Sequence, residues 1–138
     1  MIDVFGKALL ELLDDPGVAA ITDRIRGHQP GPDDAKGPGE YVAFVVVTDL
    51  GGPPLPRTPV QFARLNVRCY GATPQGAKAL YVACSNALHH IGPRVHGTVG
   101  LYISHDTTGG AEGQDPRTDQ PYIDFVVELI ATAAAVTV

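Results

Sequence analysis

The chain has 138 residues, a formal net charge of −5 at pH 7, 44% hydrophobic and 18% charged residues. This length predicts a single domain with its own core, and this composition excludes global disorder. The acidic balance argues against a protein that grips nucleic-acid backbone, because Lys and Arg supply that affinity. The absence of a run of 18 apolar residues argues against a membrane-spanning helix.

The N-terminal residues and the two cysteines predict the cellular compartment of the protein. Residues 1–15 have neither the basic start nor the unbroken apolar stretch of a signal peptide. Two cysteines, Cys69 and Cys84, predict reduced thiols in a protein of the cytoplasm and not a disulfide framework.

Glycine and proline, 16 and 12 residues respectively, gather in three polar stretches. These stretches are residues 27–40, 51–60 and 104–121, and each is predicted to be a loop. Loops of this length are uncommon in a small domain and usually have a function. We therefore expect a small folded body whose loops contact neighbouring molecules.

The first predicted elements are a helix and a short strand. Apolar residues from Ile2 to Leu13 recur at helical spacing, and Pro16-Gly17 is predicted to end this helix. Residues 19–26 are predicted to form a short strand with Ile21 and Ile25 on one face.

Two longer strands follow. Residues 41–50, YVAFVVVTDL, are β-branched and almost continuously apolar, which predicts a strand covered on both faces. Residues 62–70 alternate, so that Leu65, Val67 and Cys69 share an apolar face with Ala63. The opposite face of this strand, which carries Arg64 and Arg68 with Asn66 and Tyr70, is predicted to meet water.

The second helix has the clearest signals in the chain. Thr73 is a suitable N-cap, and Pro74 follows at the first helical position. An apolar stripe at three- and four-residue spacing predicts the face buried against the sheet, and it comprises Ala77, Leu80, Cys84, Ala87, Leu88 and Ile91. Gly92-Pro93 is predicted to end the helix.

Strands are also predicted at 99–104 and 122–131, which gives the order α-β-β-β-α-β-β. The fold class is therefore α+β, with a mainly antiparallel or mixed sheet of four or five strands and two helices packed on one face. The charges suggest an antiparallel register that places Arg64 opposite Glu128 and Arg68 opposite Asp124. The same register places Leu65 opposite Val127 and Val67 opposite Phe125 on the apolar face.

Candidate chemical sites have ordinary structural explanations. His89 and His90 are adjacent and would point about 100° apart on a helix, so they do not make the i, i+4 pair of a metal site. Cys84 lies on the apolar stripe, where a free cysteine acts as a small hydrophobic residue. Gly109, Gly110 and Gly113 lack a phosphate-binding pattern and are predicted to form a flexible loop. We therefore expect no catalytic residue, no metal and no cofactor.

The acidic loop residues match no calcium-binding spacing. The uncharged C-terminal stretch ATAAAVTV either completes a core strand or contacts another subunit, and both readings remain open. Contacts with other subunits or partners are expected from the loops 28–40, 51–61 and 105–121 and from this C-terminal segment. The candidate contact residues are Asp33, Asp34, Lys36, Arg57, Asp106, Arg117, Asp119, Val136 and Val138.

The layout resembles the tail terminator, or tail-completion, proteins of long-tailed bacteriophages. The resemblance runs over nearly the whole chain: a helix ending near DDPGV, then ITDRI, a Pro-rich loop, YVAFVVV, and finally PYIDFVVEL after a Gly-rich loop. Its most telling part is ARLNVRCYGATPQGAKALYVACSNAL at 63–88, where a strand runs through Gly71 and Thr73 into a helix rich in small residues.

The resemblance implies a virion structural protein that is assembled in the host cytoplasm. Such proteins form a ring, typically a homo-hexamer, on the completed tail tube, where they stop polymerisation and dock to the head connector. Expected partners are therefore further copies of the chain, the major tail tube protein and the connector. DNA would only pass through the channel, without sequence-specific binding, and no membrane is involved. Alternatives are another neck component, such as a head-closure or adaptor protein, and a small enzyme or ligand-binding domain.

Overall fold

A computed structural model describes residues 12–30, 34, 39–51, 60–88, 94–96, 99–106 and 110–133. For residues 51, 60–63, 94–96, 99–106 and 129–133 the backbone alone is described. The elements are α2 (Pro16–Ala19), β1 (Ile25–Gly27), β2 (Phe44–Gly51), β3 (Val60–Tyr70), α3 (Pro74–Leu88), β4 (Arg94–His96), β5 (Val99–Asp106), β6 (Ala111–Gln114) and β7 (Pro121–Ala133).

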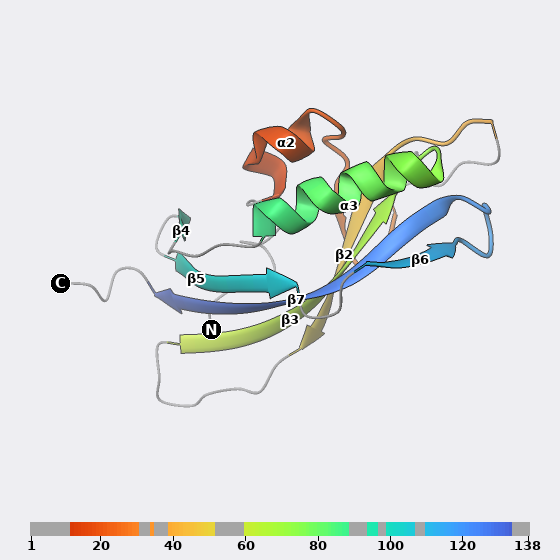
Figure 1. Ribbon diagram of the computed structural model, residues 1–138. Helices are drawn as coiled ribbons and strands as arrows, with labels where there is room; N and C mark the ends of the chain where they lie inside the picture. The colour runs from red at the N-terminus through yellow and green to blue at the C-terminus, as the bar shows by residue number, and fades with distance from the viewer. Residues whose placement is uncertain are drawn as a thin grey trace.

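The strands form one mixed sheet with the order β1-β2-β3-β7-β5-β4, and β6 also pairs with β7. The β1–β2 pair is parallel and the other pairs are antiparallel. Figure 1 shows α2 and α3 together on one face of this sheet. The predicted α+β class is confirmed, although the described sheet has seven strands and not four or five.

The central strand pair has the register predicted from its charges. Arg64 lies opposite Glu128, and Arg68 lies opposite Asp124. On the other face of the same pair, Leu65 lies opposite Val127 and Val67 lies opposite Phe125. The two-residue period of a strand fixes both faces at once, so a slip of one residue would bury the charges and expose the apolar side chains.

The main core lies between α3 and the sheet. Leu80 and Cys84 of α3 are 0% exposed and pack in one cluster with Leu65, Val67 and Phe125. The N-cap is also as predicted, since the Gly76 N–H donates to Thr73 Oγ1 at 3.0 Å. The described part of the helix ends at Leu88, so Ile91 and the predicted stop at 92–93 lie outside the described residues.

β2 is covered on both faces, as its continuous apolar run predicts. Val45 and Val47 join the core under α3, whereas Phe44 and Val46 join a second cluster with Tyr70 on the opposite face. The strand begins at Phe44 and not at Tyr41. The face of β3 predicted to meet water is therefore partly covered, because Tyr70 is only 3% exposed.

The N-terminal prediction needs correction. Residues 12–14 are helical, in agreement with the predicted first helix, and residues 1–11 lie outside the described part. Pro16 does not end helical structure but begins the short helix α2, in which Asp15 Oδ2 accepts a hydrogen bond from the Val18 N–H at 3.0 Å. Proline suits this position because the first helical N–H needs no partner within the helix. α2 occupies part of the predicted strand 19–26, so β1 is short and Ile21 is 40% exposed.

The prediction of a long loop at 104–121 is wrong. β5 continues to Asp106, β6 occupies Ala111–Gln114, and a turn at 115–120 joins β6 to β7. Gly110 and Gly113 therefore border or belong to a strand, and Gly109 lies outside the described residues. The sequence analysis also did not predict β4, which pairs with β5 in antiparallel orientation. β3 begins at Val60, and β7 runs to Ala133, so the C-terminal stretch completes a sheet strand at least that far.

Candidate functional site

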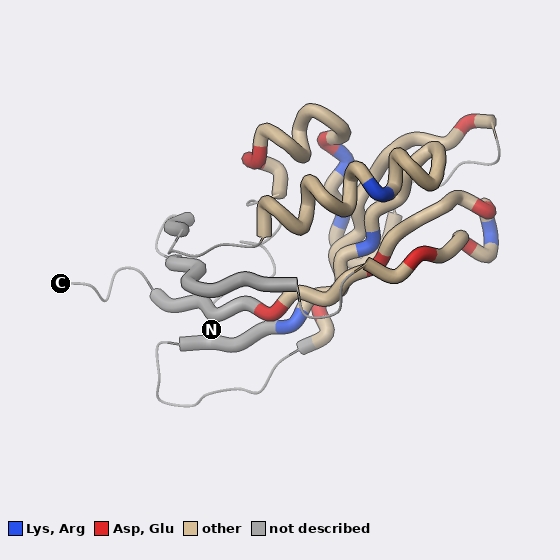
Figure 2. The backbone as a smooth tube through the Cα atoms, viewed as in Figure 1, with Lys and Arg blue, Asp and Glu red and all other residues tan. Residues whose placement is uncertain are grey.

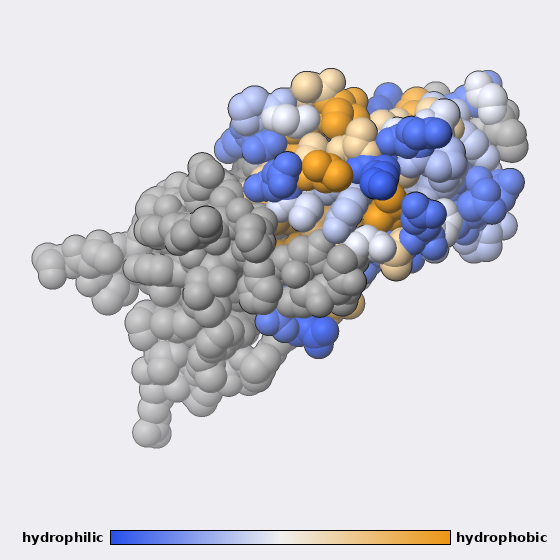
Figure 3. Space-filling view, viewed as in Figure 1, coloured by the Kyte–Doolittle hydropathy of each residue, from blue (hydrophilic) through white to orange (hydrophobic). Residues whose placement is uncertain are grey.

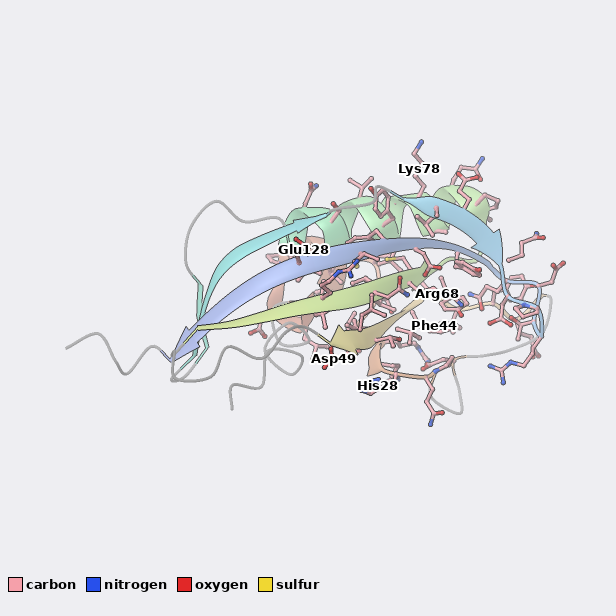
Figure 4. All side chains as sticks on the ribbon, turned by 90° about the horizontal axis from the view of Figure 1, so that it is seen from below. His28, Phe44, Asp49, Arg68, Lys78 and Glu128 are labelled. Atoms are coloured by element: carbon pink, nitrogen blue, oxygen red, sulfur yellow. The ribbon has the colours of Figure 1, made fainter. Side chains whose placement is uncertain are left out.

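The sheet face opposite α2 and α3, here called the open face, carries the paired charged side chains of the central strands β3 and β7. Figure 4 looks onto this face, with Arg68 and Glu128 on the sheet and Lys78 projecting from α3 away from it. Cross-strand partners share a face, so the register also places Asn66, Tyr122 and Asp124 here.

A groove of about 400 Å³ lies on the open face. Its floor is formed by side chains of β2 and β3, including Val46, Asn66 and Arg68, and its walls are the segments 28–30 and 115–117. The walls come from two of the stretches predicted to be contact loops. The fold therefore brings parts of these two stretches to the lining of one hollow.

Arg68 is held in place on the groove floor. Its Nε and Nη2 donate to the two carboxylate oxygens of Asp124 at 2.8 and 2.9 Å, and its guanidinium carbon lies 4.1 Å from the centre of the Tyr122 ring. Hydrogen bonding to Asp124 raises the pKa of Arg68 above its ordinary value. Arg64 makes a looser pair with Glu128 at 3.7 Å. Both arginines are thus paired across the central strands, as predicted.

Tyr70 connects the sheet to the turn at 115–120. Its ring stacks on Phe44 with a centroid distance of 4.2 Å, and its hydroxyl donates to Asp115 Oδ2 at 3.2 Å. Burial raises the pKa of Tyr70. The hydroxyl therefore stays protonated and acts as a donor to Asp115.

Asp115 is the centre of that turn. Its Oδ1 accepts the N–H of Arg117 at 2.8 Å and the N–H of Thr118 at 3.3 Å. Burial by itself would raise the pKa of Asp115, but these two N–H donors outweigh it, and the pKa is lowered below 3.8. A charged Asp115 thus fixes one wall of the groove.

Gln120 closes the same turn from inside the protein. It is 0% exposed, and its Nε2 donates to Val42 O at 2.7 Å and to Gly71 O at 3.3 Å. Its Oε1 has no hydrogen-bond partner among the described residues. The turn predicted to be a flexible contact loop is therefore tied to the chain before β2 and to the end of β3.

Asp34 differs from its predicted role as a surface contact. It is 0% exposed and accepts hydrogen bonds from Arg24 Nη1 at 2.9 Å and Arg26 Nε at 2.8 Å. The carboxylate can be buried because Arg26 of β1 and Arg24, just before this strand, both donate to it. It ties the stretch 28–40 to the sheet edge, so its side chain is not available at the surface of this chain.

The other candidate contact residues are distributed as follows. Arg117 and Asp119 are exposed on the turn at 115–120. Asp106 is the last residue of β5, for which the backbone alone is described. The remaining candidates, Asp33, Lys36, Arg57, Val136 and Val138, lie outside the described residues. Sequence reasoning missed Tyr70 and Asp115 as a linked pair, although the polar-face position of Tyr70 was recognised.

The described part of the chain has neither a metal-binding cluster nor a membrane-spanning helix. It contains no group of three His, Cys, Asp or Glu side chains that could hold a metal ion. None of its helices is long and apolar enough to cross a membrane. Cys69 and Cys84 are free and buried in the core, and burial raises the pKa of Cys69.

Figure 2 shows the Lys and Arg positions of the described chain interspersed with Asp and Glu positions. Arg24, Arg26, Arg64 and Arg68 lie on or beside the open face, and Arg117 lines its groove. The structure describes six Lys and Arg side chains in all. The sixth is Lys78, which lies on α3. Asp14 and Asp23, by contrast, flank α2 and are exposed.

A scan of protein-family models and a search of curated proteins give no match to this chain. Among solved structures, the fold is similar to a chain from the virion of a native gene transfer agent particle. That likeness covers 91% of this chain and 92% of the other, with a TM-score of 0.63 and 16% sequence identity. The two chains thus share an α+β fold over almost their whole lengths.

Proposed function

We propose that this protein is a structural component of a phage-like virion that caps the completed tail tube as a homo-oligomeric ring. The observation that carries the proposal is the shared fold with a chain of a gene transfer agent virion, over 91% of this chain. A match along almost the whole length means that the likeness is not confined to one small supersecondary motif.

The arrangement of the site supports an architectural role. On the floor of the open-face groove, Arg68 is hydrogen-bonded to Asp124. The turn beside the groove is fixed by hydrogen bonds to Asp115. Hydrogen-bonded networks of partly buried polar groups rigidify a surface. A rigid, polar face between two anchored segments suits contact with other protein subunits.

The ring would be hexameric, would end tail polymerisation and would present the docking surface for the head connector. Its partners would be its own copies, the tail tube protein and the connector, with DNA passing through the lumen. A ring arises when a head-to-tail contact closes after a whole number of subunits, and otherwise the same contact grows into a filament. The protein would therefore be located at the head–tail junction of the virion.

The test is complementation in a producing phage or prophage from which the coding sequence of this chain has been removed. A tail terminator predicts tails of abnormal length and full heads that are not joined to them, and the wild-type chain supplied in trans should restore joined particles. Tails of normal length that fail only to join would indicate a head-side neck component. Normal infectious particles without the chain would refute a virion role altogether.

A further inference from the structure

The two cysteines of the chain meet in the core between α3 and the sheet. Cys69 belongs to β3 and Cys84 belongs to α3, and both side chains are 0% exposed within one apolar cluster. Their thiols share a hydrogen bond. Because the two residues belong to different elements, it is the packing of the helix on the strand that brings the two sulfur atoms into contact.

The backbone of α3 passes close to the end of β3 in this region. Two residues after Cys69, a Cβ at Gly71 would lie 2.2 Å from the backbone nitrogen of Ala77. Ala77 and Cys84 both lie on the buried stripe of α3. A disulfide joins residues whose Cα atoms lie about 4.4–6.8 Å apart, so a helix and a strand can be cross-linked only where their backbones come close.

The folded structure protects both thiols from reagents in the solvent. Figure 3 shows apolar and hydrophilic side chains of α2 and α3 packed side by side on the outside of the helix layer, above the core that contains the sulfur atoms. Burial and the hydrogen bond to Cys84 raise the pKa of Cys69. The thiolate is the reactive form of cysteine, so reaction requires a transient opening of α3 from the sheet.

We propose that Cys69 and Cys84 are an oxidisable pair that closes to a disulfide between β3 and α3 when the protein meets a peroxide. The chain has two cysteines, so each has one possible partner within the chain. In a reducing cytoplasm the pair stays in the thiol form, whereas an oxidising environment outside the cell favours the disulfide. The inference concerns the chemistry of this chain and does not depend on the proposed virion role.

The reaction proceeds in two steps. In the first step, the thiolate of one cysteine attacks an oxygen of hydrogen peroxide, the O–O bond breaks, and protonation of the departing hydroxide leaves a sulfenic acid and one water. In the second step, the thiolate of the other cysteine attacks the sulfenic sulfur, the S–S bond forms, and the S–O bond breaks to release a second water. The two sulfur atoms together lose two electrons, and one peroxide is reduced to two waters.

The test treats the folded wild-type chain, at low protein concentration, with excess hydrogen peroxide. Remaining thiols are then blocked with N-ethylmaleimide, and the protein is digested with trypsin. Cleavage after Arg68, Lys78 and Arg94 places the two cysteines in separate peptides, 69–78 and 79–94. We expect these two peptides to be recovered as one linked species that a reducing agent separates.

The linked protein is also expected to be more stable, because a cross-link restricts the unfolded chain. Its midpoint of thermal unfolding should rise by about 5 °C or more and return to the original value after reduction. Cys69→Ala and Cys84→Ala are the matched controls, and each should give neither the linked species nor the rise. The remaining cysteine of each variant is expected to advance to sulfinic acid, because its sulfenic acid has no second thiol within the chain.

Four results would overturn the proposed pair. The first is recovery of peptides 69–78 and 79–94 from the wild type as separate sulfinic or sulfonic acids, and the second is a cross-link between two chains in place of the internal one. The third is persistence of both free thiols in the folded chain under conditions that link them in urea. The fourth is a linked protein that unfolds at a lower temperature than the reduced protein.

Discussion

Gly71 lies directly against the first turn of α3, where a Cβ at position 71 would be 2.2 Å from the backbone nitrogen of Ala77. The chain leaves β3 and enters α3 within a few residues, and the helix backbone passes over the glycine. Only a residue without a side chain permits this approach, so Gly71 fixes the spacing between the sheet and its covering helix.

Gly71→Ala is therefore expected to lower the free energy of unfolding by about 2 kcal/mol or more, because two backbone segments would have to separate. Gly76→Ala is the control within the same turn, since its nearest neighbour would be the Thr73 hydroxyl at 3.3 Å. That change is expected to stay within about 1 kcal/mol. Urea unfolding measures both, and equal effects would contradict the close-packing argument.

Leu80 is the central side chain of the interface between α3 and the sheet, at 0% exposure. Leu80→Ala is expected to cost about 2–5 kcal/mol of stability, the usual range for a buried leucine that leaves a cavity. Val82→Ala lies on the same helix at a side chain that is 46% exposed, and it should change stability by about 0.5 kcal/mol or less. If the two substitutions had similar effects in urea unfolding, the buried face of α3 would be misassigned.

The two arginine pairs of the central strands should differ in strength. Asp124→Asn weakens a bidentate contact to a guanidinium whose side chain is only 34% exposed, and a loss of about 1–2 kcal/mol is expected. Glu128→Gln weakens a 3.7 Å contact between side chains that are 55% and 47% exposed, and little or no loss is expected. Chemical denaturation at low and high salt provides the comparison. A larger loss of stability for Glu128→Gln than for Asp124→Asn would contradict the expected order of the two ion pairs.

The lowered pKa of Asp115 predicts that the stability of the protein depends on pH. Its folded-state pKa is lowered below 3.8, so the charged form stabilises the fold above the unfolded pKa, and this stability is lost as the pH falls through the folded pKa. Asp115→Asn removes the titration, and the difference in stability between wild type and variant should therefore shrink on acidification from pH 5 towards about pH 2. Thermal melts across this range test the expectation, and a difference independent of pH would contradict it.

Elements whose signals are local and periodic could be predicted from the sequence. Thr73 and Pro74 mark the start of α3, and the apolar stripe through Leu80 and Cys84 marks its buried face, because capping and helical spacing are properties of one segment. The register of β3 on β7 was also predictable. Charges and apolar side chains alternate on both strands, and only one alignment satisfies both faces.

Other features depend on contacts between segments that lie far apart in the chain, and local sequence signals do not predict them. Asp34 is buried because Arg24 and Arg26 converge on it, and nothing in its Gly- and Pro-rich surroundings indicates those partners. β6 is a strand because β7 supplies its hydrogen bonds, and Gly113 suits it because the Tyr122 ring occupies the space of its missing Cβ. The groove exists only because the 28–30 and 115–117 segments both border the same part of β2 and β3. Short polar segments have no periodicity of their own, so the long-range partners determine their conformation.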